Sequence, residues 1–251
     1  MQLPQNTKPA LIIGNGPSVD KIDPRTLSQF TTYGCNHIVR KFEHWGQNTD
    51  HVLITDSRRL PEIGSAYQNQ PTSLWIGDER YRTPPQPYIR RIAGRDFNPI
   101  HQLFKPRFRK VRLFSRIPCP NFFRAFVFDK SRFSFDPVEG FNFGQSVTLS
   151  AIQLAIAHGH KIICLTGMET SYNTPKDYFA GMTSSISFVN DVFIANPRRW
   201  MEPLLVLLQI QAEPLGVSLI DCTPGGSLKF VAKGELTDSG CGYTIKEHRL
   251  S

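Results

Sequence analysis

The sequence predicts an α/β fold in which helices cover both faces of a mostly parallel sheet. Short apolar runs of strand length alternate with segments of helical periodicity, and most of the apolar runs end in Gly, Asn, Ser or Asp. At 251 residues and 40% hydrophobic composition, the chain is long and apolar enough to bury a sizeable core. We therefore expect one Rossmann-like domain over residues 1–251.

The first half of the chain begins with a buried strand and a glycine turn. "ALII", residues 10–13, is wholly apolar, and the Asn-Gly-Pro-Ser that follows is typical of a tight turn. Pro17 suits the first turn of a helix. Helix-like and strand-like segments then alternate. We expect helices at 20–30 and 39–46, and strands at 31–38, 50–56 and 72–77.

The second half begins with a longer helix at 144–159. Its apolar residues recur at helical spacing, Ser and Thr stand near its start, and Gly159 ends it. A buried strand follows, then a helix entered through Pro203, then a last strand that ends in Pro-Gly-Gly-Ser. We place these three elements at 161–167, 200–216 and 217–223. The polar, glycine-rich tail from Lys233 onward is expected to order only by packing on the rest.

A basic, aromatic insert interrupts this alternation. Residues 80–132 contain 14 Lys and Arg against two Asp, a charge of +12 in a chain whose total is +8. We interpret 80–140 as a lid-like subdomain, because it is rich in proline and its hydrophobic periodicity is poor. Such a composition can line a phosphate-rich or single-stranded nucleic-acid groove. The alternative is a solvated arginine-rich surface with aromatic side chains packed beneath it.

Several classes of protein are disfavoured by the composition. The chain has no apolar run of 18 residues and no apolar region near its N-terminus, so we expect a cytoplasmic protein without a spanning helix or signal peptide. Its five cysteines are odd in number and widely spaced, which favours reduced thiols over disulfides or a metal site. We expect neither a nucleophilic role for Cys241 nor metal binding by His158 and His160.

Polar residues follow five of the predicted strands. Since ligands of open parallel sheets bind outside the carboxyl ends of the strands, these turns are expected to form one crevice for a nucleotide-type ligand. The glycine turn in particular could point backbone N–H groups at an anion. Val19 replaces the third glycine of a dinucleotide fingerprint. The five turns are Gly14-Asn15-Gly16-Pro17-Ser18, Cys35-Asn36-His37, Thr55-Asp56-Ser57, Thr166-Gly167-Met168-Glu169 and Thr223-Pro224-Gly225-Gly226-Ser227.

The order and spacing of "GNGPS", "CNH" and "LTGME" carry a resemblance. From Leu11 to about Tyr172, with the insert omitted, the chain resembles bacterial sialyltransferases that use CMP-activated sialic acid. It is also similar to the broader family of archaeal 6-hydroxymethylpterin diphosphokinase and motility-associated flagellin glycosyltransferases. Beyond Tyr172 the resemblance rests mainly on "DCTPGGS".

The resemblance implies roles for particular residues. Asn15 and Gly16 would contact the nucleotide phosphate and ribose, and Asn36 the phosphate region. Ser146 or Thr148 would meet the ribose or base. The remaining implied nucleotide contacts are Gly14, Pro17, Ser18, Gly167 and Tyr172. Tyr172 and Tyr178 would correspond to the tyrosines that those enzymes carry beyond the glycine of the fifth strand.

The chain departs from that pattern at two places. Asp56 stands where those enzymes have a further nucleotide-binding Asn. The segment "VNDVFIANPRRWMEP" has no histidine where their general base would fall. A base is still needed to deprotonate an acceptor hydroxyl, and the candidates at strand ends are His37, Asp56 and Glu169.

Two further roles stay open. Asp56 could instead hold Mg²⁺ with pyrophosphate oxygens, because magnesium usually takes one or two carboxylates plus phosphates. Arg198 and Arg199, or arginines of the insert, could stabilise the charge of the leaving phosphate.

These observations lead to three hypotheses of function. The first is a glycosyltransferase that moves a sugar from a nucleotide-activated donor, preferably a CMP-sugar, to the hydroxyl of a glycan or small molecule. The second is a Mg²⁺-dependent pyrophosphokinase acting on a heterocyclic alcohol. The third is a nucleic-acid-binding protein or a DNA-base-modifying transferase that uses the basic insert.

Overall fold

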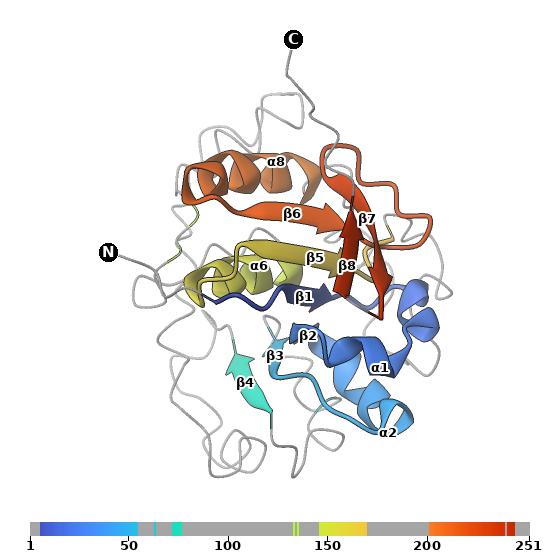
Figure 1. The fold of residues 1–251 in the computed structure, drawn as a ribbon. Helices are drawn as coiled ribbons and strands as arrows, with labels where there is room; N and C mark the ends of the chain where they lie inside the picture. The colour runs from blue at the N-terminus through green and yellow to red at the C-terminus, as the bar shows by residue number, and fades with distance from the viewer. Residues whose placement is uncertain are drawn as a thin grey trace, which may run out of the picture.

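A computed structural model describes residues 6–54, 63, 72–76, 133, 135, 146–169, 201–238 and 240–243. Its strands form one sheet in the order β4-β3-β2-β1-β5-β6-β7-β8 (Figure 1). Every neighbouring pair is parallel except β7 and β8, which are antiparallel. The predicted α/β class with a mostly parallel sheet is confirmed. The strands are β1 (Ala10–Ile13), β2 (Thr31–Cys35), β3 (His51–Ile54), β4 (Ser73–Ile76), β5 (Ile162–Thr166), β6 (Ser218–Asp221), β7 (Ala232–Thr237) and β8 (Gly240–Tyr243).

The strand order reverses beside β1. The chain adds β2, β3 and β4 on one side of β1, and then returns to place β5 on the other side. Ala10 is therefore paired both with Thr31 of β2 and with Ile163 of β5. The carboxyl ends of β1 and β5 mark the point of reversal, where open parallel sheets bind their ligands.

Helices cover both faces of the sheet, as predicted. The longer α6 and α8 share one apolar cluster with Ala10 and Ile12 of β1. The short helices of the first half pack in a second cluster with Leu11 and Ile13. Burial on both faces explains the continuous apolar run of β1. The helices are η1 (Pro17–Lys21), α1 (Pro24–Leu27), η2 (Asn36–Lys41), α2 (Phe42–Trp45), α6 (Val147–Ala157), α8 (Met201–Ala212) and η7 (Glu213–Leu215), where η denotes a 3-10 helix.

Helix α6 confirms its prediction in detail. The side chain of Ser146 caps its first turn by accepting a hydrogen bond from the Thr148 backbone N–H. Gly159, with φ of +88°, lets the chain turn into β5 after its end. All eleven residues of the helix are buried, so α6 lies deep between the sheet and α8.

Two sequence expectations need correction. The strand expected over 31–38 ends at Cys35, because Asn36 adopts a left-handed φ of +47° and starts η2. The strand expected at 217–223 is not the last, since β7 and β8 follow it. The residues of β7 are exposed or partly exposed, so this strand lacks the continuous apolar run by which a buried strand is recognised in a sequence. Of the insert expected at 80–140, only Phe133 and Phe135 fall within the described residues.

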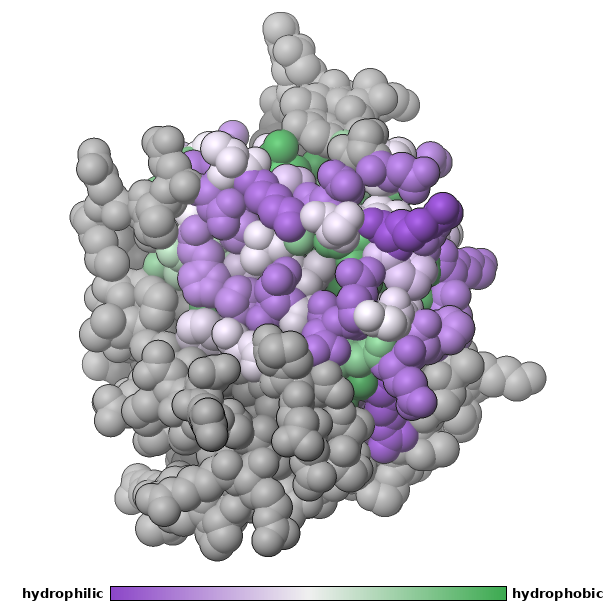
Figure 2. All heavy atoms as spheres, turned by 60° about the horizontal axis from the view of Figure 1, so that its bottom comes forward, coloured by the Kyte–Doolittle hydropathy of each residue, from purple (hydrophilic) through white to green (hydrophobic). Residues whose placement is uncertain are grey.

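The described surface is mainly polar. Figure 2 shows one face on which hydrophilic residues dominate and apolar residues form small spots. Within the described ranges, Ile210 and Phe230 are the large apolar residues left exposed. No helix in these ranges is both long enough and apolar enough to cross a bilayer.

Near the amino-terminal edge of the sheet, three histidines pack around Tyr33. The Tyr33 hydroxyl lies 2.7 Å from His158 Nδ1 and 3.0 Å from His160 Nε2. The Trp75 indole N–H donates to His51 Nδ1 at 3.2 Å, so that nitrogen acts as an acceptor and His51 is neutral. Burial lowers the pKa of His51 and of His158 to about 4.

This histidine cluster predicts acid-sensitive stability. The folded-state pKa of about 4 lies below the ordinary value of 6.5, so the unfolded chain binds protons that the folded chain does not. The free energy of unfolding should therefore fall as pH drops from 6.5 to 4, by about 3 kcal/mol for each of His51 and His158. Denaturant titrations at a series of pH values measure this dependence.

A matched pair of variants isolates the histidines from the carboxylates that titrate in the same range. His158→Gln should remove part of the pH dependence, whereas His44→Gln, at an exposed position, should leave it unchanged. Equal pH profiles for wild type and His158→Gln would contradict the assignment.

Candidate functional site

The turns after β1 and β5 are bonded directly to each other. Gly14 N–H donates to the Thr166 carbonyl at 2.8 Å, and Gly16 N–H donates to the Gly167 carbonyl at 3.0 Å. A Cβ on Gly14 would lie 2.3 Å from the Gly167 carbonyl oxygen. Gly167 itself has φ of +69°, and a Cβ there would meet Val19 at 2.7 Å. The two turns can approach this closely only because both positions are glycine.

The glycine turn already holds an anion, and this anion is a side chain of the same protein. Ser18 N–H donates to Glu169 Oε1 at 2.6 Å. The other carboxylate oxygen, Oε2, lies over Gly16, where a Cβ would come within 1.6 Å of it. The sequence analysis expected backbone N–H groups of this turn to face an anion. Those of Gly14, Gly16 and Ser18 instead donate to backbone carbonyls and to Glu169, and Pro17 has no N–H.

Two asparagine side chains remain available at this edge. The Oδ1 atoms of Asn15 and Asn36 are buried and have no hydrogen-bond partner within the described ranges. Asn36 is also the non-glycine residue of those ranges with a positive φ. Asn tolerates the left-handed region better than most residues, and such strained positions cluster at binding sites. Asn15 and Asn36 are therefore the amide groups best placed to contact a ligand.

A cavity of about 590 Å³ lies at the carboxyl ends of β5 and β6. Ser18 and Thr166 line it, and each has a buried hydroxyl without a partner in the described part of the chain. Thr223 also lines it and accepts a hydrogen bond from the Met168 N–H at 3.2 Å. The expected convergence of the turns that follow β1, β5 and β6 is thus observed.

The cavity carries more negative than positive charge. Its floor holds Asp221, which accepts a hydrogen bond from Thr223 N–H at 3.0 Å and forms an ion pair with Lys233. Lys21 is the other lysine of the lining. Four acidic residues line the cavity beside these two lysines, and one of them, Asp23, is ion-paired with Arg25. The remaining excess of negative charge suits a hydroxyl-rich ligand better than a phosphate. The four acidic residues are Asp23, Asp221, Glu235 and Asp238.

The other predicted residues fall into three groups. Thr148, at the start of α6, reaches the same edge and places its Oγ1 3.5 Å from Met168 Sδ. Ser146 is occupied as the cap of that helix. His37 lies in η2 with 1% of its surface exposed. Outside the described residues lie Asp56, Tyr172, Arg198 and Arg199, and the proposed roles of these four stay predictions.

Sequence reasoning missed the importance of Asp221 and Lys233. An aspartate directly at the end of a buried apolar strand was the available signal. The role of Lys233 could not be predicted, because the sequence analysis assigned this residue to a polar tail. In the structure it lies in β7, where strand pairing aligns it with Asp221.

The fold is shared with known glycosyltransferases. No protein-family model matches the chain, and no curated protein matches it in sequence. Among solved structures, sialyltransferase CstII from Campylobacter jejuni in complex with cytidine-5'-monophosphate is similar over 97% of this chain and 92% of its own, with a TM-score of 0.51 and 17% identity. CstII in complex with CMP-3FNeuAc is similar over 96% of this chain and 92% of its own, with a TM-score of 0.51 and 16% identity.

MAf glycosyltransferase from Magnetospirillum magneticum AMB-1 is also similar, at 14% identity and a TM-score of 0.49. The match covers 93% of this chain and 34% of that one. The two CstII matches confirm, at the level of the fold, the resemblance inferred from "GNGPS", "CNH" and "LTGME".

The contact between the two glycine turns predicts a strong effect of Gly14→Ala. The new Cβ would overlap the Gly167 carbonyl, which cannot move without disturbing the hydrogen bonds between the turns. We expect the free energy of unfolding to fall by about 1–3 kcal/mol, as measured by urea denaturation. Gly242→Ala is the control, since its Cβ would meet Thr237 Cγ2 at an ordinary 3.4 Å. Equal urea midpoints for the two variants would refute the packing argument.

Proposed function

We propose that this protein is a glycosyltransferase that moves a sugar from a nucleotide-activated donor, preferably a CMP-sugar, to an acceptor hydroxyl. The observation that carries the proposal is a pair of buried amide oxygens, Oδ1 of Asn15 and of Asn36, which have no partner in the described part of the chain and lie at the edge where the strand order reverses. The likeness in fold to a CMP-bound sialyltransferase supports it.

The two amides suit the polar part of a nucleotide. Each carries an NH₂ that can donate to a phosphate oxygen and a carbonyl that can accept from a ribose hydroxyl. They follow adjacent parallel strands, β1 and β2, so both reach the same edge of the sheet. A buried amide oxygen without a partner is unfavourable, and a bound ligand that donates to it removes this penalty.

Glu169 is the best placed of the three base candidates. Ser18 N–H fixes one carboxylate oxygen, and the other, Oε2, has no partner within the described ranges. Oε2 is buried, so neighbouring residues would have to move aside before it could accept a proton from an acceptor hydroxyl. His37 is almost fully buried in η2, where an acceptor cannot reach it without movement of the chain. Asp56 remains a candidate by its sequence position alone.

The acidic cavity is our proposed place for the hydroxyl-rich acceptor, either a glycan or a small molecule. Its volume of about 590 Å³ lies within the usual range of small-molecule sites. Ser18 connects the cavity to Glu169, because its N–H binds the carboxylate and its side chain lines the cavity. This arrangement would bring an acceptor hydroxyl toward the proposed base.

Nucleotide binding tests the donor site through Asn36→Gly. Glycine accepts the positive φ of this position, so the variant should fold normally while losing the amide. We expect its affinity for CMP, measured by calorimetry, to be about 10- to 100-fold weaker than that of wild type. Asn48→Ala, which removes an amide before β3 at the opposite edge, should bind CMP normally.

A thermal-shift panel of CMP, UDP, GDP and ATP, each with and without Mg²⁺, completes the test. The proposal expects the largest stabilisation from CMP without a need for Mg²⁺. Normal CMP binding by Asn36→Gly would reject the proposed site. A preference for ATP with Mg²⁺ would instead favour the pyrophosphokinase hypothesis, and binding to DNA with a steep salt dependence would favour the nucleic-acid hypothesis.

Glu169→Gln tests the proposed base. The amide keeps an oxygen that can accept from Ser18 N–H, but it cannot take a proton from the acceptor. We expect kcat for sugar transfer from a CMP-sugar to fall about 10²- to 10⁴-fold with little change in KM for the donor. Glu43→Gln, at an exposed position, is the matched control. Unchanged kcat in Glu169→Gln would exclude Glu169 as the base.

A further inference from the structure

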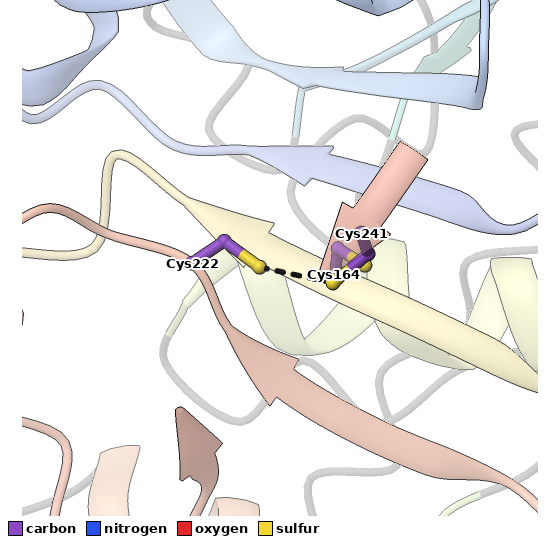
Figure 3. A group of neighbouring side chains, drawn as sticks. All are labelled: Cys164, Cys222 and Cys241. Carbon is purple, nitrogen blue, oxygen red and sulfur yellow. Dashed lines mark hydrogen bonds between the residues drawn. The ribbon is translucent and has the colours of Figure 1, made fainter. Parts of the chain in front are cut away.

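Three cysteines that are far apart in the sequence meet on one face of the sheet (Figure 3). Cys164 lies in β5, Cys222 directly follows β6, and Cys241 lies in β8. Their Sγ atoms all lie within 4.8 Å of one another, and those of Cys222 and Cys241 are 3.3 Å apart. Sequence spacing had favoured reduced thiols over disulfides or a metal site. The β7–β8 hairpin brings Cys241 back over β5, a contact that spacing cannot reveal (Figure 1).

The surroundings of the three thiols are largely apolar. Cys164 and Cys222 belong to the buried cluster that contains Ile13 and Ile220, and Cys241 packs against its margin. Three thiolates so close together in an apolar region are unfavourable unless a cation is bound between them.

We propose that Cys164, Cys222 and Cys241 form a binding site for a thiophilic metal ion, with Zn²⁺ as the ion that fits their geometry. Zinc binds thiolates at about 2.3 Å, which places the sulfurs of one site roughly 3.8–4.0 Å apart. The sulfurs here lie between 3.3 and 4.8 Å apart, so closing around an ion requires shifts of about 1 Å or less. Thiolates are also the ligands that select soft ions over Mg²⁺ or Ca²⁺.

The fourth position of a tetrahedral ion would be taken by water. The nearest carboxylate in sequence, Asp221, is already bound by Lys233 and by Thr223 N–H. Cys241 is partly exposed, so the cluster reaches the surface at that thiol. This provides a path for the ion to enter and for the thiol protons to leave.

A bound ion would fasten the hairpin to the sheet. β7 pairs with β6 through only two residue pairs, Ile220 with Ala232 and Asp221 with Lys233. The hairpin is otherwise held by side-chain contacts with the second apolar cluster. Three metal–sulfur bonds that join β5, the end of β6 and β8 would add a cross-link where backbone pairing is sparse.

Zinc binding by the full-length chain tests this site. The reduced protein is freed of metal with a chelator, incubated with Zn²⁺, separated from free ion and assayed for zinc by mass spectrometry. We expect one zinc per chain and a higher unfolding temperature. Cys164→Ser and Cys241→Ser should each weaken zinc binding at least tenfold. Two controls should retain it: Cys35→Ser, which removes a described thiol that is not part of the cluster, and His158→Gln, which alters the histidine cluster.

A second measurement needs no variant and so does not depend on how the serine variants fold. Zn²⁺ should slow alkylation of Cys164, Cys222 and Cys241 in the wild-type chain, with each site mapped by peptide mass spectrometry. Unchanged alkylation, or full zinc binding by Cys241→Ser, would overturn the proposal. A Cys222–Cys241 disulfide in protein purified without reductant, together with no zinc uptake after reduction, would do the same. None of these results bears on CMP binding, so the metal site is tested independently of the proposed function.

Discussion

The close approach of two glycine turns determines the architecture of the functional edge. Because Gly14 and Gly167 carry no side chains, the turns after β1 and β5 bond to each other through backbone groups. This contact uses the N–H groups of Gly14 and Gly16. Within the described ranges, the buried side-chain oxygens at this edge that have no partner include Asn15 Oδ1, Asn36 Oδ1 and Glu169 Oε2.

The sequence predicts those parts of the fold whose burial leaves a local pattern. β1 and β5 are buried on both faces and appear as continuous apolar runs, while α6 shows its cap, its periodicity and its terminal glycine. β7 leaves no such pattern, because most of its residues are partly exposed and its partner β6 lies across a long connection. The meeting of Cys164 with Cys241 depends on that hairpin and could not be predicted either.

At the site, too, features set by neighbouring residues in the sequence could be predicted, whereas contacts between distant residues could not. The rule that ligands bind at the carboxyl ends of parallel strands correctly gathered Ser18, Thr166 and Thr223 around one cavity. It could not show which atoms remain available, because the partner of Ser18 N–H is Glu169, 151 positions away in the chain. Nor could it show the left-handed turn at Asn36, which sits in an otherwise strand-like sequence.

The pairing of β1 with β5 also has a consequence for how this architecture can diversify. Ala10 lies opposite Ile163, so the whole stretch from β2 to α6 is a single loop closed by the centre of the sheet. The entropy lost in closing a loop grows only with the logarithm of its length, by about 0.6 kcal/mol for each doubling. A change in the length of the chain between β1 and β5 therefore alters the entropy of closure little, and the pairing of these two strands at the centre of the sheet can be kept while that length varies.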